Sequence, residues 1–282
     1  MLARAGHAVT LIGRAQHVQV FERDGLRMQT LSFDEQVPVA ASTEAAAVAG
    51  ADVVLFAVKS PDTEATGEQM RPHLKAGALV LCLQNGVDNA ERLRAVLPDV
   101  DVAAAVVYVA TEMAGPGHLR HHGRGELVIE PSAGSARLAQ ALMAAGVPTE
   151  ISDNVRGALW AKLILNCAYN ALCALGKLPY GPLVERPGVR EVMADVVAEC
   201  RAVAAADGVT LPGDVDLAVR RIAETMPTQF SSTAQDLMRG KPTEIDHLNG
   251  HVVRRGATLG VPTPANRVLW TLVKLAEVAP PG

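Results

Sequence analysis

The sequence has few of the features that mark secreted, membrane or nucleic-acid-binding proteins. No charged-then-apolar leader with a cleavage site opens it, so nothing indicates secretion. Its longest apolar stretches are interrupted before they reach the roughly 18 residues that a membrane span needs. It has 26 basic and 30 acidic side chains and no basic run, which argues against a general nucleic-acid surface. We therefore expect a cytoplasmic protein with neither a membrane nor a nucleic-acid partner.

Cysteine is also scarce, and no C-x-x-C pair occurs. This pattern predicts reduced core thiols in a cytosolic protein and no zinc site. His247 and His251 have a spacing that can bind zinc, but no H-E-x-x-H motif accompanies them, which favours a solvated helix face. The four cysteines lie in apolar contexts at Cys82, Cys167, Cys173 and Cys200.

The chain has 282 residues, 49% of them hydrophobic, enough for one large domain or two ordinary ones. Its first half alternates β-branched runs with helical stretches. Apolar strands separated by helices predict a parallel sheet covered on both faces. The predicted strands are 7–12, 52–58, 78–83 and 102–110, and the helices between them include 62–74 and 88–97.

The pattern changes twice after this. Short alternating runs over 118–130 indicate an antiparallel hairpin around Gly123 and Gly125, followed by a helix at 135–145 and a strand at 148–151. Beyond Asn154 only helices are indicated, separated by prolines. We predict an α/β, Rossmann-like domain at 1–152 and an all-helical domain at 153–282. The predicted helices of the second domain are 155–175, 188–206, 214–225, 231–238, 243–259 and 264–278.

A dinucleotide-binding domain of this kind begins with a strand and a G-x-G-x-x-G turn. The sequence has neither a strand nor this turn at its start. Its first residues are typical of the end of a helix capped by Gly6. Either residues upstream of Met1 complete the fold, or the chain is a damaged relative. Without that strand the sheet lacks a central member, so its neighbours are expected to expose apolar surface.

Open α/β sheets bind ligands at the carboxyl ends of their strands. Each strand end could be ordinary turn chemistry, because such turns are polar and Asn-Gly is a common turn pair. Together, at one rim, they favour a ligand site. The four strand ends are Gly13-Arg14, Lys59-Ser60, Gln84-Asn85-Gly86 and Ala110-Thr111.

Arg14 indicates which cofactor would bind. NAD enzymes commonly place an acid after the second strand to bind the ribose hydroxyls. Here that place holds Arg14, and no acid follows until Glu22. A guanidinium suits a 2′-phosphate, which predicts NADP.

Lys162, Asn166 and Asn170 recur at four-residue intervals and share one side of the predicted helix 155–175. An amphipathic helix would also have a polar face, but a broad one rich in Glu, Arg and Lys. This stripe is narrow, and a lysine on an otherwise buried helix needs a partner or a polar cavity. We therefore favour a stripe that lines a cavity.

A second polar group spans Ser231-Ser-Thr-Ala-Gln-Asp and Thr243-Glu-Ile-Asp-His-Leu-Asn-Gly. Ser231 or Thr243 could simply be a helix N-cap, followed by a solvated first turn. On this evidence Glu244 alone indicates little.

These residues match a known family. The motifs Arg-Ala-Gly-His-x-Val-x-Leu-Ile-Gly-Arg, Gln-Asn-Gly, Leu-Trp-x-Lys-Leu-x-x-Asn-Cys-x-x-Asn, Ser-Ser-x-x-Gln-Asp and Thr-Glu-Ile-Asp-x-Leu-Asn-Gly recur in the family's order. The chain resembles the ketopantoate reductase (2-dehydropantoate 2-reductase) family from residue 1 almost to its end.

The resemblance implies reduction of a small 2-oxo acid, ketopantoate, on the route to pantothenate. It further implies a homodimer, with NADPH in a cleft between a Rossmann domain and a helical substrate domain. By the same resemblance, an asparagine that the family often uses is replaced near Tyr180. Carried over by motif, the catalytic residues are Lys162 and Glu244, the substrate contacts Asn166, Asn170 and Ser232, and the cofactor contacts Lys59, Asn85, Ala110 and Glu244.

Three alternatives stay open at this point. The substrate could be another 2-oxo acid, because the family has members of uncertain substrate. The chain could be a 3-hydroxyacid dehydrogenase of the 6-phosphogluconate type, which also joins a Rossmann domain to helices and a lysine. It could also be a non-catalytic relative, as the missing glycine loop suggests.

Overall fold

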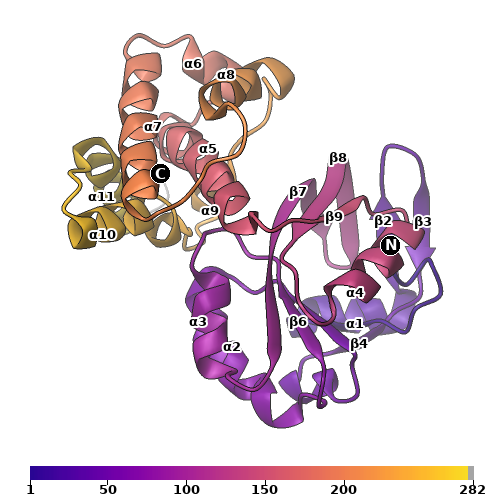
Figure 1. Ribbon diagram of the computed structural model, residues 1–282. Helices are drawn as coiled ribbons and strands as arrows, with labels where there is room; N and C mark the ends of the chain where they lie inside the picture. The colour runs from indigo at the N-terminus through magenta and orange to yellow at the C-terminus, as the bar shows by residue number, and fades with distance from the viewer. Residues whose placement is uncertain (279–282) are drawn as a thin grey trace. The chain divides into compact units, whose positions relative to one another are not determined.

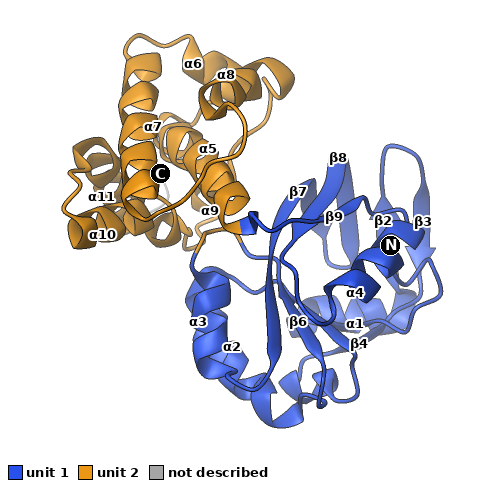
Figure 2. Ribbon diagram, in the orientation of Figure 1, with its two compact units in different colours: residues 1–84, 88–155 blue, residues 85–87, 156–282 orange. Residues whose placement is uncertain are grey.

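The computed structural model describes residues 1–278 and divides into two compact units. Unit 1 contains Met1–Gln84 and Asp88–Val155. Unit 2 contains Asn85–Val87 together with the chain from Arg156 onward (Figure 2).

Unit 1 is built on a mixed seven-stranded sheet, in the order β3-β2-β8-β7-β6-β5 with β9 on β8 (Figure 1). Strands β5 (Val53–Phe56), β6 (Leu79–Cys82) and the start of β7 (Asp101–Gly115) pair in parallel, and β8 has parallel neighbours in β2 and β9. From Ala105 onward, β7 pairs antiparallel with β8. The remaining strands of this sheet are β2 (Leu26–Gln29), β3 (Asp34–Val37), β8 (His118–Ile129) and β9 (Thr149–Ile151).

Strand β6 is covered on both faces, as predicted for a strand inside a parallel sheet. All four of its residues are buried, and alternate side chains point to opposite faces. Leu79 and Leu81 pack with α4 (Ser135–Ala144), whereas Val80 packs in a second cluster with side chains of α2 (Thr63–Met70) and α3 (Asn89–Val96). The Rossmann-like α/β fold class is therefore confirmed.

The first predicted strand lies outside this sheet. Strand β1 (Thr10–Ile12) pairs in parallel with β4 (Ala40–Ser42) to form a separate two-stranded sheet, and β5 ends the larger sheet. The prediction of one sheet that includes residues 7–12 was wrong. Ile12 on β1 is 44% exposed and Leu55 on β5 is 41% exposed.

The predicted hairpin turn at Gly123 and Gly125 was also wrong. The turn lies at Pro116-Gly117, and β8 runs through both glycines. They have φ of 138° and 146°, next to register shifts in the pairing with β7. A β-bulge and a hairpin turn both need the backbone freedom of glycine. A glycine in the sequence therefore does not distinguish a bulge within a strand from a turn between strands.

Unit 2 is helical, which confirms the second part of the fold prediction. By length and mean hydropathy, 1.4, α5 could span a membrane, but 67% of that window is buried inside the protein. This burial is typical of the core helix of a soluble protein. The helices are α5 (Val155–Gly176), α6 (Tyr180–Val184), α7 (Val189–Ala206), α8 (Val215–Thr225), α9 (Ser232–Met238), α10 (Asn249–Leu259) and α11 (Pro264–Val278).

Several elements differ from the prediction. The helix predicted over 243–259 is broken, because Thr243 and Glu244 are non-helical and a short 3₁₀ turn, η4 (Ile245–His247), precedes α10. The helix predicted over 62–74 is likewise three elements: η2 (Ser60–Asp62), α2 and η3 (Arg71–His73). Elements that the sequence pattern did not reveal are α1 (Ala15–Asp24), β2, β3, β4, η1 (Ala45–Val48) and α6.

The four cysteines are free and buried, as predicted. Burial raises the pKa of the Cys82 thiol to about 11, so this thiol is protonated at neutral pH. A protonated, enclosed thiol is a poor nucleophile.

Candidate functional site

Arg14 lies at the carboxyl end of β1 and is the N-cap residue of α1. It is exposed, and within residues 1–278 its guanidinium forms no hydrogen bond or ion pair. The first N–H groups of a helix favour an anion, and a guanidinium can pair with the same anion. This end of β1 therefore has the chemistry to bind a phosphate group.

Two further predicted cofactor contacts lie in unit 1. Lys59 follows β5, is exposed and is the N-cap of η2. Ala110 is half-buried within β7, opposite Gly123. The prediction that the strand ends at Ala110 was wrong, since β7 continues to Gly115. The parallel pairing between β6 and β7 ends earlier, where Cys82 pairs with Ala104.

The predicted polar stripe lies along α5. Lys162 and Asn166 are half-buried and Asn170 is 3% exposed. Leu163 and Cys167, which alternate with the stripe, are at most 1% exposed. The stripe is thus a narrow polar row on a buried helix, unlike the broad polar face of a surface helix.

Ser231 connects this stripe to α9. It is the N-cap of that helix, and its Oγ accepts from the N–H of Ala234 at 3.1 Å. The same hydroxyl donates to the carbonyl of Asn170 at 3.2 Å. Ser232, the predicted substrate contact, is the exposed first residue of α9. Of the two residues considered as N-caps, Ser231 caps a helix and Thr243 does not. The bond from Ser231 to α5 was not predictable, because Ser231 and Asn170 are far apart in sequence.

Glu244 lies on a segment that is anchored on both sides. Before it, Thr243 is buried and donates its N–H and its hydroxyl to Oε1 of Glu277, at 2.9 and 2.7 Å. After it, Ile245 is fully buried in the helical core. Asp246 accepts from Nε1 of Trp270 at 2.7 Å. These contacts fix the backbone on both sides of Glu244. The side chain of Glu244 itself is half-buried.

Lys274 joins the two carboxylates of this anchor, at 2.7 Å from Glu277 and 2.9 Å from Asp246. Burial raises the pKa of Glu277, but hydrogen bonds from Lys274 and Thr243 outweigh it, and the pKa is lowered. For Asp246, burial is likewise outweighed by Lys274 and Trp270, so its pKa is also lowered. Both groups are therefore carboxylates at neutral pH.

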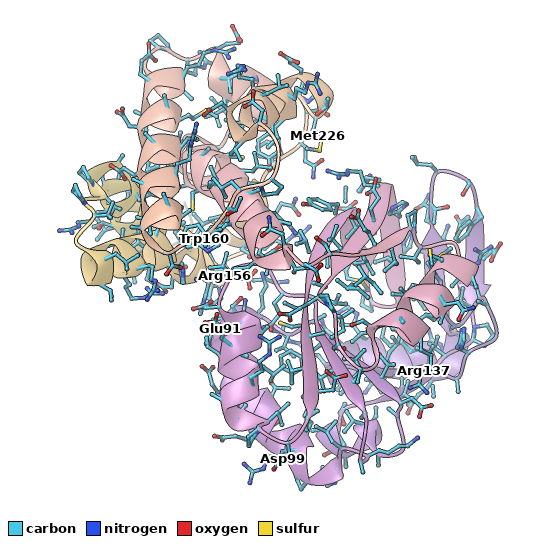
Figure 3. The ribbon with its side chains drawn as sticks, viewed as in Figure 1. Glu91, Asp99, Arg137, Arg156, Trp160 and Met226 are labelled. Atoms are coloured by element: carbon cyan, nitrogen blue, oxygen red, sulfur yellow. The ribbon has the colours of Figure 1, made fainter. Side chains whose placement is uncertain are left out.

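Tyr180 and His251 have packing roles. Tyr180 is 9% exposed, and its ring packs edge-on to Tyr169 at a centroid distance of 4.9 Å. His251 packs edge-on to Trp160 at 5.8 Å, so the prediction that it lies on a solvated face was wrong. Trp160, labelled in Figure 3, is 1% exposed. Within the described part of the chain, no group of three or more His, Cys, Asp or Glu side chains could hold a metal ion.

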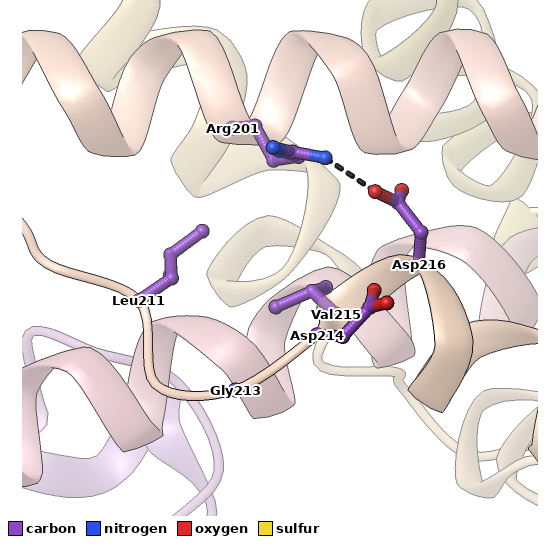
Figure 4. Close-up of a pocket in the computed structure, with 6 residues that line it drawn as sticks. All are labelled: Arg201, Leu211, Gly213, Asp214, Val215 and Asp216. Carbon is purple, nitrogen blue, oxygen red and sulfur yellow. Dashed lines mark hydrogen bonds and ion pairs between the residues drawn. The ribbon is translucent and has the colours of Figure 1, made fainter.

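A surface pocket of about 310 Å³ lies elsewhere, between α7 and the start of α8 (Figure 4). The charged side chains that line it already have partners: Arg201 pairs with Asp216, and Asp214 caps α8 by accepting from the N–H of Leu217. None of the predicted site residues lines it. We therefore base the candidate site on the α5 stripe and not on this pocket.

Comparison with known proteins gives consistent matches along the chain. The family profile described as "Ketopantoate reductase PanE/ApbA" matches residues 1–134, and the profile described as "Ketopantoate reductase PanE/ApbA C terminal" matches residues 154–277. A 2-dehydropantoate 2-reductase of Halobacterium salinarum is 34% identical, over 98% of this chain and 93% of its own.

Two solved structures are similar over most of their length. A PanE/ApbA family ketopantoate reductase from Ralstonia eutropha is 68% identical, with a TM-score of 0.96 over 98% of this chain and 92% of that chain. A ternary structure of D-mandelate dehydrogenase with NADH and anilino(oxo)acetate is 26% identical, with a TM-score of 0.89 over 98% and 93%.

Proposed function

The chain belongs to the PanE/ApbA ketopantoate reductase family, and we therefore propose that it reduces 2-dehydropantoate to pantoate with NADPH. The observation that carries this proposal is the α5 stripe, which places one amine and two carboxamides in a row on a buried helix. A 2-oxo acid needs one acid for its ketone oxygen and neutral hydrogen-bond donors for its other polar atoms. The stripe supplies both.

Lys162 is the proposed general acid. A reduced nicotinamide supplies the hydride when it is bound. The ammonium of Lys162 polarises the ketone of the substrate and then transfers a proton from Nζ to the alkoxide oxygen that develops. It thus combines electrostatic stabilisation with general acid catalysis.

Four other side chains orient the reacting groups in this proposal. Glu244, on its anchored backbone, orients the amine of Lys162 and hydrogen-bonds the cofactor. Asn166 and Asn170 donate to polar atoms of the substrate, and Ser232 binds its carboxylate. Placing these groups on a rigid helix and an anchored segment lowers the entropic cost of alignment.

We propose NADPH over NADH because of Arg14. Its exposed guanidinium and the N-terminus of α1 together favour a 2′-phosphate, whereas an acid at this place would favour ribose hydroxyls. Lys59, Asn85 and Ala110 complete the proposed cofactor contacts.

A cytoplasmic homodimer is the assembly we propose. In α11, four large apolar side chains are exposed, and a contiguous apolar face on a soluble protein commonly marks a contact with another protein. Light scattering on the purified protein would measure the mass, and a monomer at all micromolar concentrations would contradict the dimer. The four side chains are Val268, Leu272, Leu275 and Val278.

The test of the function is turnover. We expect ketopantoate-dependent loss of NADPH absorbance, with pantoate identified by mass spectrometry. Lys162→Ala should nearly abolish turnover. Lys177→Ala, which removes an exposed lysine just beyond α5, should leave it unchanged. Near-normal turnover by Lys162→Ala would overturn the mechanism.

A second candidate is reduction of another 2-oxo acid. The similarity to a D-mandelate dehydrogenase in complex with NADH favours an aryl 2-oxo acid with NADH as the alternative. Comparing kcat/KM for ketopantoate and for an aryl 2-oxo acid, each with both cofactors, separates the two candidates. Including 3-hydroxy acids in the oxidation direction tests the 6-phosphogluconate type.

A further inference from the structure

Unit 1 contains a buried cluster of polar side chains that the proposed chemistry does not use. Ser60 and Thr63 are 0% exposed, Asn89 is 2% and Gln84 is 7% exposed. Ser60 and Thr63 follow β5, and Gln84 and Asn89 follow β6. These two strands are hydrogen-bonded neighbours, with Phe56 paired to Cys82. The cluster therefore links two adjacent strand ends at the rim of the sheet.

Thr63 is the centre of this cluster. Its hydroxyl accepts from Nε2 of Gln84 at 2.8 Å and donates to the carbonyl of Ser60 at 2.9 Å. Gln84 in turn accepts from the thiol of Cys82 at 3.1 Å, and Nδ2 of Asn89 donates to Oγ of Ser60 at 3.2 Å. Each segment is thus tied to the other through side chains, in addition to the strand pairing.

Arg92 of α3 closes the cluster at its edge. Its guanidinium donates to the carbonyl of Ser60 at 3.0 Å and to Oδ1 of Asn89 at 3.1 Å. It also pairs with both carboxylate oxygens of Glu64 in α2, at 2.6 and 2.5 Å. The Ser60 carbonyl therefore accepts from side chains of two different helices, Thr63 of α2 and Arg92 of α3, which restrains the turn that begins at Lys59.

We propose that Thr63 and Gln84 are positioning residues for the dinucleotide cofactor. Lys59 immediately precedes Ser60, and Asn85 immediately follows Gln84, so the cluster fixes the backbone from which both proposed cofactor contacts project. Satisfied buried polar networks rigidify the backbone around them and help to specify one arrangement of it. This inference rests on the proposed use of a dinucleotide cofactor.

A purely structural role makes a different prediction. If the cluster only held α2 and α3 against the sheet, breaking it would lower stability and leave cofactor affinity unchanged. Thr63→Val keeps the shape of the side chain and removes the hydroxyl, whereas Thr63→Ser keeps the hydroxyl. Ser135→Ala is the matched control, because Ser135 is a 1% exposed hydroxyl in the same unit that donates to the carbonyl of Glu130.

The experiment measures Kd for NADPH by fluorescence titration, and KM and kcat by turnover, on the full chain. Thr63→Val should raise Kd and KM for NADPH about tenfold, since misplacing reacting groups by about 1 Å can cost about a hundredfold and a smaller shift should cost less. Its kcat at saturating NADPH should stay within about twofold of wild type, because the acid on α5 is untouched. Thr63→Ser should restore the affinity, and Ser135→Ala should lower the melting temperature without changing Kd.

A Kd for Thr63→Val equal to that of wild type would overturn the inference. If Thr63→Val does not fold, Gln84→Met tests the same bond from its donor side, with the same expected rise in Kd. Failure of the proposed function looks different: wild type would bind NADPH but not reduce ketopantoate. In that case the titrations still decide whether the cluster positions the cofactor.

Discussion

Replacing Glu277 by Leu should destabilise the helical unit, because Glu277 is the acceptor for Thr243. Two donors of Thr243, its N–H and its hydroxyl, converge on one carboxylate oxygen. Thr243 is 5% exposed, so water cannot fully replace that acceptor. An unsatisfied buried donor costs about 1–3 kcal/mol. For two donors with some relaxation we expect the free energy of unfolding to fall by about 2–4 kcal/mol.

Tryptophan fluorescence restricts this assay to the helical unit. The chain has two tryptophans, Trp160 on α5 and Trp270 on α11, both in unit 2. Denaturant unfolding followed by tryptophan emission therefore reports on that unit. Glu277→Gln is the matched variant, since it keeps a carbonyl oxygen for Thr243 and should lose less stability than Glu277→Leu. A loss below about 0.5 kcal/mol for Glu277→Leu would refute the reasoning, since surface substitutions already reach that size.

The charge of Glu277 adds a pH dependence of known sign. Its pKa is lowered in the folded protein, so the folded state holds its proton less tightly than the unfolded chain does. The resulting stability is present above the ordinary glutamate pKa and is lost as the pH falls through the folded value. The stability difference between wild type and Glu277→Gln should therefore be largest near neutral pH and shrink in acid.

Three further outcomes are expected. Lys162→Met should change the melting temperature little, because Lys162 is only half-buried and methionine is an unbranched side chain of similar size that adapts to its surroundings. A large drop in melting temperature would assign Lys162 a structural role. Wild type should prefer NADPH over NADH by at least about tenfold in kcat/KM, or roughly 1.4 kcal/mol. Arg14→Asp should narrow or reverse this ratio of kcat/KM values. Equal use of NADPH and NADH by wild type would contradict the Arg14 assignment. Tyr169→Phe removes a 2.8 Å hydrogen bond to the carbonyl of Val219 and should cost about 1 kcal/mol in denaturant unfolding; no change would mean that water already satisfies this carbonyl.

The sequence predicted elements whose signal is periodic and strong. The strands that became β5 and β6 are continuous apolar runs, and α5 combines apolar faces with a regular polar stripe. Such patterns follow from burial on both faces of a sheet or on all sides of a helix. They predicted the fold class and the position of Lys162 on a core helix.

Contacts between distant parts of the chain were not predictable in the same way. Glu277 reaches Thr243, and Ser231 reaches Asn170, across dozens of residues, and no local pattern encodes either bond. The short strands β2 and β4 have weak alternation, and their pairing is decided by β8 and β1. Thr63 and Gln84 likewise have the sequence pattern of ordinary polar turn residues. Their hydrogen bond depends on the pairing of β5 with β6, which the local sequence does not show.

Residues Asn85–Val87 belong to the helical unit although the chain on either side of them belongs to the α/β unit. Val87 packs against the helical core. The helical module is therefore not one contiguous block of the gene. A chimaera that exchanges only the part after residue 155 would join a new set of helices to a tripeptide inherited from the other parent. Successful recombination between members of this family should then favour parents that agree at Val87, or crossovers that transfer residues 85–87 together with the helices.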